Sequence, residues 1–228
     1  AMNKFFHTVT SSFVLAALFV VGVSAWYLLR HREQKMACKS IAIASAFGFV
    51  FALVTAMTGD KSGAVIARVQ PMKLAAMEAL YDGQQGAPLT AIGIVSLMSF
   101  RDADAYVAGI NDLVNGNEKY GVMSAAEKME RGRVAVGELA RYRAALEAGD
   151  QAVIDQITAK FDPSKPEGEE FLREYFAYFG YGYLDTPQQI VPNVPLLFYS
   201  FRVMVGAGCF FILLLGVIWW LNRKDKLA

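Results

Sequence analysis

Three side chains within apolar stretches of this sequence could do chemistry in a membrane: His7, Arg202 and Met204. Ionisable residues inside membrane helices are costly, so they are candidates for function. Singly, each has an ordinary explanation: a histidine packs near a helix end, an arginine snorkels to the interface, and a methionine fills a gap. Together, a histidine and a methionine at one depth could ligate a haem iron from both faces, which favours electron transfer over oxygen binding.

The spacing along the chain places these two ligand candidates at similar depth. His7 lies 23 residues before Arg30, roughly 35 Å of helix. Met204 lies 19 residues before Arg223, roughly 29 Å of helix. The two helices are predicted to run in the same direction, so both side chains would lie in the outer leaflet. Arg202 would then place a fixed positive charge beside the haem, near its propionates.

A second pair of candidates, Lys73 and Glu78, lies in a more polar segment. Pro71 suits the first turn of a helix that runs to about Tyr81. A spacing of five residues places the two charges about 140° apart on an ideal helix, so they do not form an ideal i,i+4 ion pair. From the residues alone, two solvated charges on an amphipathic helix are the simplest interpretation.

The elements that must position these residues follow from the hydropathy. Hydrophobic residues make up 55% of the 228 residues and charged residues 19%, against about a quarter in soluble chains. Residues 5–29, 40–58 and 203–221 form long apolar runs, interrupted among charges only by the titratable His7. About 20 residues of helix cross a bilayer, where the backbone must satisfy its own hydrogen bonds. We therefore predict an all-α integral membrane protein with three transmembrane helices.

Charge predicts the orientation of these helices. Residues 59–190 carry 13 basic and 19 acidic residues, whereas the short segments 30–39 and 223–228 are basic. By the positive-inside rule, both basic segments lie in the cytoplasm. The predicted layout is a first helix at 1–29, a cytoplasmic loop at 30–39, a second helix at 40–58, an external and mainly helical loop domain at 59–194, a third helix at 195–222 and a cytoplasmic tail at 223–228. This distribution excludes a uniform soluble globule and a nucleic-acid binder with a basic face.

Within the external segment, residues 59–63 predict a turn that ends the second span. Ser124–Ala148 is predicted as a helix with a capping box and a C-terminal Gly149, Asp150–Phe161 as a second helix, and Glu169–Phe179 as a third. Residues 90–122 do not decide between helix and loop. The segment contains no histidine or cysteine, which disfavours a hydrolase or metal site there.

Several motifs, taken in order, resemble subunit I of the cytochrome bd-type quinol oxidases. The resemblance covers most of the chain and is weakest over residues 90–175. Its most specific motifs are the Gln-Pro-Met-Lys-Leu-Ala-Ala-Met-Glu run at 70–78 and the Phe-Arg-Val-Met run at 201–204. The other landmarks are His7-Thr-Val-Thr-Ser-Ser-Phe, Val23-Ser-Ala-Trp-Tyr-Leu-Leu, Gly59-Asp-Lys-Ser-Gly and Gly180-Tyr-Gly-Tyr.

The resemblance implies a role for each candidate residue. His7 and Met204 would be the axial ligands of a low-spin haem b, and Arg202 would favour the reduced haem. The external segment would be the quinol-binding loop, with Lys73 and Glu78 taking part in the oxidation of ubiquinol or menaquinol. The family's high-spin haem b and haem d need helices that do not occur in these residues. The chain is thus expected to be a central fragment that works with the missing helices and a second membrane subunit in a bacterial inner membrane, with residues 59–194 on the periplasmic side.

Two other interpretations fit parts of the pattern. A generic b-type cytochrome anchor of a quinone-linked dehydrogenase usually needs two histidines in the membrane, and His31 lies in the cytoplasmic basic loop. A non-enzymatic membrane sensor or interaction protein with an external helical domain would explain the topology equally well. It would not explain why His7 and Met204 match in depth. No nucleic-acid partner is expected.

Overall fold

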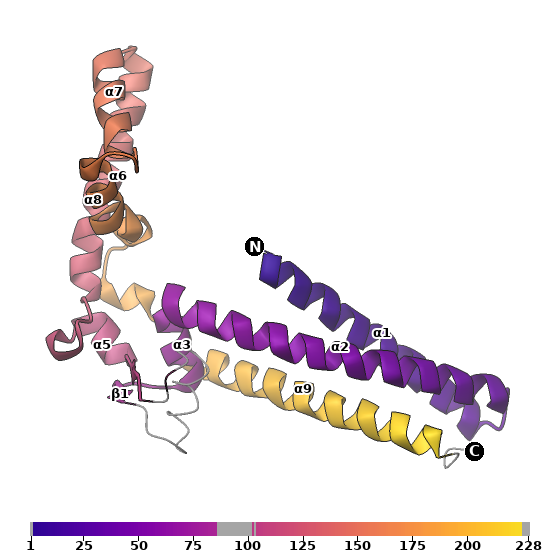
Figure 1. The fold of residues 1–228 in the computed structure, drawn as a ribbon. Coiled ribbons are helices and arrows are strands. Elements are labelled where there is room, and N and C mark those ends of the chain that lie inside the picture. The colour runs from indigo at the N-terminus through magenta and orange to yellow at the C-terminus, as the bar shows by residue number, and fades with distance from the viewer. Residues whose placement is uncertain (1, 86–101, 103, 225–228) are drawn as a thin grey trace. The chain divides into compact units, whose positions relative to one another are not determined.

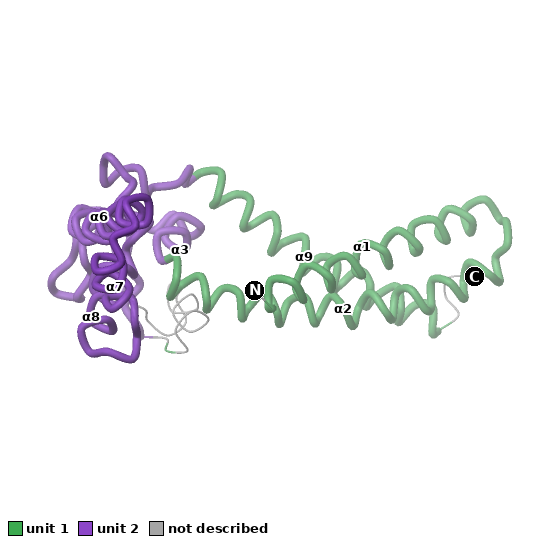
Figure 2. The backbone as a smooth tube through the Cα atoms, turned by 90° about the horizontal axis from the view of Figure 1, so that it is seen from above, with its two compact units in different colours: residues 1–70, 94–103, 195–228 green, residues 71–93, 104–194 purple. Residues whose placement is uncertain are grey.

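The computed structural model describes residues 2–85, 102 and 104–224. Its backbone contacts divide the chain into two compact units (Figure 2). The first unit is built from the long helices α1 (Met2–Leu29), α2 (Gln34–Val69) and α9 (Val194–Arg223). The second unit holds the shorter elements between α2 and α9 (Figure 1). The prediction of an all-α membrane protein is confirmed, because three helical segments, Met2–Leu29, Gln34–Val69 and Pro187–Arg223, are long and apolar enough to cross a bilayer.

Small residues let α1 and α2 approach closely. Ala44, Gly48 and Ala52 recur every four residues along α2 and so form one stripe on that helix. A Cβ atom on Gly48 would lie 2.6 Å from the Cβ of Ala17 on α1, so this contact has no room for a side chain. Close approach through small residues is the common way in which membrane helices associate.

Helix α9 joins this pair through its C-terminal half. Leu215 is fully buried in a cluster with Val14 and Val21 of α1 and the small residues of α2. The Trp219 ring stacks on Phe49, with ring centroids 6.3 Å apart. The side-chain amide of Asn222 donates to the backbone oxygen of Cys38 at 3.1 Å. The end of α9 therefore meets the start of α2, and α1 and α9 run in the same direction, as predicted.

Basic side chains at this shared end cover tryptophan rings. Arg30 lies 5.6 Å from the Trp26 ring centroid and Arg223 lies 5.5 Å from that of Trp219. Such cation–π pairs at the end of an apolar bundle are typical of the interfacial belt of a membrane protein.

The predicted turn at residues 59–63 is wrong, because α2 continues through it to Val69. A glycine inside a helix costs only about 1 kcal/mol, and local contacts offset that cost. Ser62 donates to the Thr58 backbone oxygen at 3.0 Å, and Asn3 of α1 reaches both Ser62 and that oxygen. The helix ends at Val69, because the next residue, Gln70, precedes Pro71, and a residue before proline disfavours helical geometry.

The second unit begins with α3 (Pro71–Glu78), a two-residue antiparallel pair β1 (Gln84–Gln85) and β2 (Tyr106–Val107), α5 (Ile110–Asn115) and the 3₁₀ turn η1 (Glu118–Tyr120). The sequence did not decide between helix and loop for residues 90–122. Of these, residues 90–101 and 103 lie outside the described part of the chain. The described remainder includes β2, α5 and η1.

Helices α6 (Ala125–Ala148) and α7 (Gln151–Lys160) confirm the predicted helices and the capping positions Ser124, Gly149 and Asp150. Of the predicted capping box, the structure shows only the Ser124 half, because the Glu127 carboxylate pairs with Arg131. The Ser124 hydroxyl accepts from the Glu127 backbone N–H, and Gly149 ends α6 with a φ of 70°. The Asp150 carboxylate accepts from the Val153 backbone N–H. Each polar side chain thus satisfies one of the free N–H groups at its helix start.

The predicted helix at Glu169–Phe179 is wrong in its bounds. Helix α8 covers Pro166–Glu174, and the chain then forms the 3₁₀ helices η2 (Phe176–Tyr183) and η3 (Pro187–Ile190). Packing explains the change, because α6 and η2 meet backbone to backbone at Gly132 and Gly182. A Cβ atom on Gly132 would lie 2.5 Å from the Gly182 nitrogen. The half-buried Phe161 ring packs edge-on against Phe171 and Phe176.

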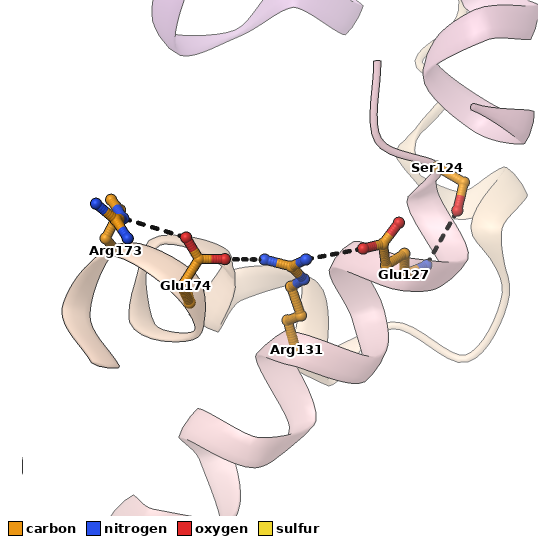
Figure 3. Close-up of polar contacts among 5 residues, drawn as sticks. All are labelled: Ser124, Glu127, Arg131, Arg173 and Glu174. Carbon is orange, nitrogen blue, oxygen red and sulfur yellow. Dashed lines mark hydrogen bonds and ion pairs between the residues drawn. The ribbon is translucent and has the colours of Figure 1, made fainter. Parts of the chain in front are cut away.

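An ion-pair chain joins α6 to α8 (Figure 3). Arg131 donates to Glu127 at 2.9 Å within α6 and to Glu174 at the end of α8. Arg173 donates to the other oxygen of Glu174 at 3.1 Å. The hydrogen bond from Arg131, followed by that from Arg173, holds the pKa of the Glu174 carboxyl below its ordinary value.

We expect Gly48→Ala to destabilise the three-helix unit by about 1–3 kcal/mol, the usual cost of overpacking a core. The added methyl group would force Ala17 and Leu215 away from α2. Gly63→Ala is the matched control on the same helix, because a Cβ atom there meets nothing within 4 Å. Thermal unfolding in detergent checks both variants. Equal melting temperatures for Gly48→Ala and wild type would contradict the close contact.

Candidate functional site

His7 lies in the second turn of α1 and is held by α2. Its Nδ1 is 3.0 Å from the Thr58 hydroxyl oxygen, and its Cε1 lies 3.4 Å from where a Cβ atom on Gly59 would be. The imidazole is half-buried. Thr58 therefore fixes one edge of the ring, which lies beside Gly59, and leaves Nε2 outside this hydrogen bond.

Met204 and Arg202 lie in the N-terminal half of α9, before the segment that packs on α1 and α2. Met204 is 57% exposed. The Arg202 guanidinium lies 3.5 Å from the ring centroid of Phe198, one turn earlier in the helix. Residues two apart do not share a helix face, so Arg202 and Met204 project from different sides of α9.

These side chains fit the ligand set of an electron-transfer haem. A neutral imidazole with one ring nitrogen hydrogen-bonded offers the other nitrogen to a metal, and a thioether is a soft axial ligand. His7 has its Nδ1 engaged with Thr58, and Met204 presents an exposed thioether side chain. His7 and Met204 come from two different helices, α1 and α9, of one unit.

Lys73 and Glu78 both lie on α3, in the second unit. Between them, Leu74, Ala75, Ala76 and Met77 are buried, with Ala75 and Ala76 fully so. Lys73 is exposed and Glu78 is half-buried. The helix is therefore anchored on its apolar side, and the two charged groups lie at its first and last turns.

The chain turns sharply directly after Glu78. Ala79 has a φ of 52°, in the left-handed region that glycine usually occupies. The Leu80 N–H donates to the Ala75 oxygen at 2.8 Å and the Ala79 N–H to the Ala76 oxygen at 3.2 Å. This pair of bonds is the Schellman motif, which ends a helix. The helix thus stops at Glu78, earlier than the predicted end near Tyr81.

The turn after Glu78 is tied to the start of α5. The backbone oxygens of Leu80 and Tyr81 accept from the N–H groups of Ile110 and Asn111, at 2.9 and 2.8 Å. The Asn111 side chain also donates to Asp82 at 2.8 Å. These bonds satisfy free N–H groups at the start of α5 and hold the Glu78 end of α3 in place.

Asp112 organises the region beside this turn. Its carboxylate accepts from the Gly109 N–H at 2.9 Å, the Tyr106 hydroxyl at 2.7 Å and the Asn117 amide at 2.9 Å. Burial raises the pKa of Asp112, but these hydrogen bonds outweigh it and hold the pKa below its ordinary value. Burial, followed by the bond to Asp112, raises the pKa of Tyr106 far above its ordinary value. The Tyr106 ring stacks on Tyr120 with centroids 3.5 Å apart.

A sequence model of the family described as cytochrome bd terminal oxidase subunit I matches residues 1–228. The chain belongs to this family. Among curated relatives, it is 29% identical to the cytochrome bd-II ubiquinol oxidase subunit 1 of Escherichia coli, over 93% of this chain and 43% of that protein. It is 27% identical to the cytochrome bd ubiquinol oxidase subunit 1 of Bacillus subtilis, over 98% of this chain and 38% of that protein.

The chain thus spans less than half the length of these cytochrome bd relatives. A solved bd oxidase from Geobacillus thermodenitrificans is also similar, at 18% identity and a TM-score of 0.44, covering 93% of this chain and 57% of the solved one. The resemblance drawn from the sequence motifs is confirmed at the level of the family.

In this cytochrome bd family member, the sequence motifs did not single out Thr58 or Asp112. Thr58 directly precedes the Gly59-Asp-Lys-Ser-Gly motif but belongs to no predicted site, and only the packing of α1 on α2 brings it to His7. Asp112 could have been found from its place three residues after Gly109, a spacing at which a carboxylate caps a helix start.

We expect Ala79→Gly to stabilise the protein by about 1 kcal/mol, since the left-handed conformation costs a residue with a Cβ atom that much. Ala76→Gly is the matched control, because the same change inside α3 should destabilise by about 1 kcal/mol. Thermal unfolding of both variants measures the difference. If both glycines lower the melting temperature equally, the left-handed turn after Glu78 is contradicted.

Proposed function

We propose that this chain is the quinol-oxidising, low-spin haem b-bearing part of a respiratory cytochrome bd-type quinol oxidase. The observation that carries this proposal is the match of the whole chain to the subunit I family. The disposition of His7 and Met204 on two apolar helices supports it. A membrane sensor, the alternative from sequence, receives no support from the relatives.

When bound, a low-spin haem b supplies a site that accepts and releases one electron. His7 would hold the iron through Nε2 and Met204 through its sulfur. Arg202 would contribute a fixed positive charge that favours the reduced state electrostatically. Its guanidinium is oriented by the Phe198 ring.

Lys73 and Glu78 would act on the quinol. A quinol gives up electrons readily only as its protons leave, so a positioned carboxylate that accepts a proton assists the oxidation. The half-buried Glu78, held at the end of α3 by the turn at Ala79, suits that role. The exposed Lys73 ammonium would donate a hydrogen bond to a quinone oxygen.

The complete oxidase would supply what these residues do not. We propose that a high-spin haem b and a haem d, further subunit I helices and a second membrane subunit complete the path from quinol to oxygen. The quinol would be ubiquinol or menaquinol; both relatives above are named as ubiquinol oxidases. The basic end shared by α1, α2 and α9 supports a cytoplasmic location for that end in a bacterial inner membrane, with residues 59–194 on the periplasmic side.

Replacing either axial ligand should remove the low-spin haem b band from a reduced-minus-oxidised spectrum of the membrane-bound oxidase. His7→Ala and Met204→Ala each delete one iron ligand. His31→Ala and Met57→Ala are the controls, because both residues are exposed and His31 lies in the loop between α1 and α2. An unchanged low-spin band in His7→Ala would refute the ligand assignment.

Replacing the carboxylate should slow quinol oxidation without loss of haem. Glu78→Gln cannot accept a proton, so we expect the turnover number to fall about 100-fold, the lower range for loss of a general base. Glu118→Gln, at an exposed position of the same unit, is the control. Oxygen consumption with a soluble quinol measures both variants. Wild-type turnover in Glu78→Gln would rule out the proposed proton acceptor.

A further inference from the structure

The Thr58 hydroxyl makes two hydrogen bonds but has only one proton. Its oxygen lies 3.0 Å from the backbone oxygen of Thr55 and 3.0 Å from Nδ1 of His7. A backbone oxygen can only accept, so the hydroxyl proton points to Thr55. The bond to His7 must then run the other way, with Nδ1–H donating to the Thr58 oxygen.

This donor assignment places the proton of the neutral His7 ring on Nδ1. With the proton on Nδ1, the neutral ring keeps its lone pair on Nε2, the nitrogen outside the contact with α2. The hydrogen-bond network assigns the tautomer here, as is usual for histidines. The ring is thus presented with its metal-binding nitrogen free and in a fixed orientation.

A second layer holds Thr58 in place. The Thr58 backbone oxygen accepts from the Asn3 amide at 3.1 Å and from the Ser62 hydroxyl at 3.0 Å. Asn3 also donates to Ser62 at 2.7 Å. These bonds link the first turn of α1 to α2 on one side of His7. The hydroxyl that faces His7 is therefore part of a connected polar cluster within an apolar helix pair.

We propose that Thr58 is a positioning residue for the haem b iron, acting through His7. This rests on the proposed function, in which His7 ligates that iron. Outer partners that accept the second N–H of a ligating histidine fix its orientation and raise its basicity. A more basic ligand stabilises the oxidised iron, so the Thr58 bond lowers the midpoint potential of haem b, opposite to the effect proposed for Arg202.

The test compares three variants of the membrane-bound oxidase. Thr58→Val keeps the shape but removes the acceptor oxygen, Thr58→Ser restores it, and Thr55→Val is the matched control. The Thr55 hydroxyl donates only along its own helix, to the Phe51 oxygen at 2.8 Å. Two quantities are measured: the midpoint potential of the low-spin haem in a spectroelectrochemical titration, and the haem retained after purification.

We expect Thr58→Val to raise the midpoint potential and to weaken haem binding about 10-fold, the lower range for loss of an outer partner. Thr58→Ser should return both quantities to wild type, and Thr55→Val should change neither. If Thr58→Val loses its haem entirely, its midpoint potential cannot be measured. The test is then whether Thr58→Ser restores haem retention.

Wild-type potential and haem retention in Thr58→Val would overturn the proposal. So would a serine variant that behaves like valine, or a Thr55→Val variant that shifts by the same amount. These results are distinct from failure of the proposed function, which is signalled by a low-spin band that persists in His7→Ala. Loss of the band in His7→Ala with no effect of Thr58→Val would leave haem b ligation standing and remove only the role of Thr58.

Discussion

Hydrocarbon offers no hydrogen-bond partner, and this constraint shapes the three-helix unit. Backbone groups are satisfied within long helices, and polar side chains must find carbonyls nearby. Eight hydroxyls of α1 and α2 do so by donating to a backbone oxygen three or four residues earlier; they are those of Thr8, Thr10, Ser11, Ser12, Ser45, Thr55, Thr58 and Ser62. A hydroxyl that donates its proton in this way can still accept a hydrogen bond through its oxygen. Thr58 accepts from another helix, and this is how a polar contact between α1 and α2 arises.

The apolar packing of α1 on α2 decides which residues meet at that contact. The Ala17–Gly48 approach, with Leu215 against it, sets the rotation and height of the two helices. From that contact, α1 extends toward its N-terminus and α2 toward its C-terminus, which brings His7 and Thr58 together across 51 residues of sequence. The Ala17–Gly48 contact and the candidate ligand His7 thus belong to one rigid pair of helices. The small size of Ala17 and Gly48 therefore affects where His7 is held.

Some helix ends could be predicted from the sequence and others could not. The ends of α6 and the start of α7 follow from caps adjacent in sequence, Ser124, Gly149 and Asp150, so they could be predicted. The end of α2 could not, because side chains from α1 support the glycine-containing stretch that looked like a turn. Helix α8 gave way to a 3₁₀ helix where Gly182 meets Gly132 of α6, a contact between distant residues. A helix end can therefore be predicted from its cap when no contact with a distant residue competes with that cap.

The sequence by itself determined three spans and the common direction of α1 and α9, and it supplied the side chains proposed to ligate a haem or meet a quinol. Hydropathy, charge and residue type depend on no long-range contact, so they are readable in order along the chain. Only the tertiary structure decided which groups hold those side chains. The inferred proton on His7 Nδ1 rests on the contact with Thr58, and the place of Glu78 follows from a left-handed Ala79 tied to α5. Both depend on helix rotation and register, which packing between distant residues sets.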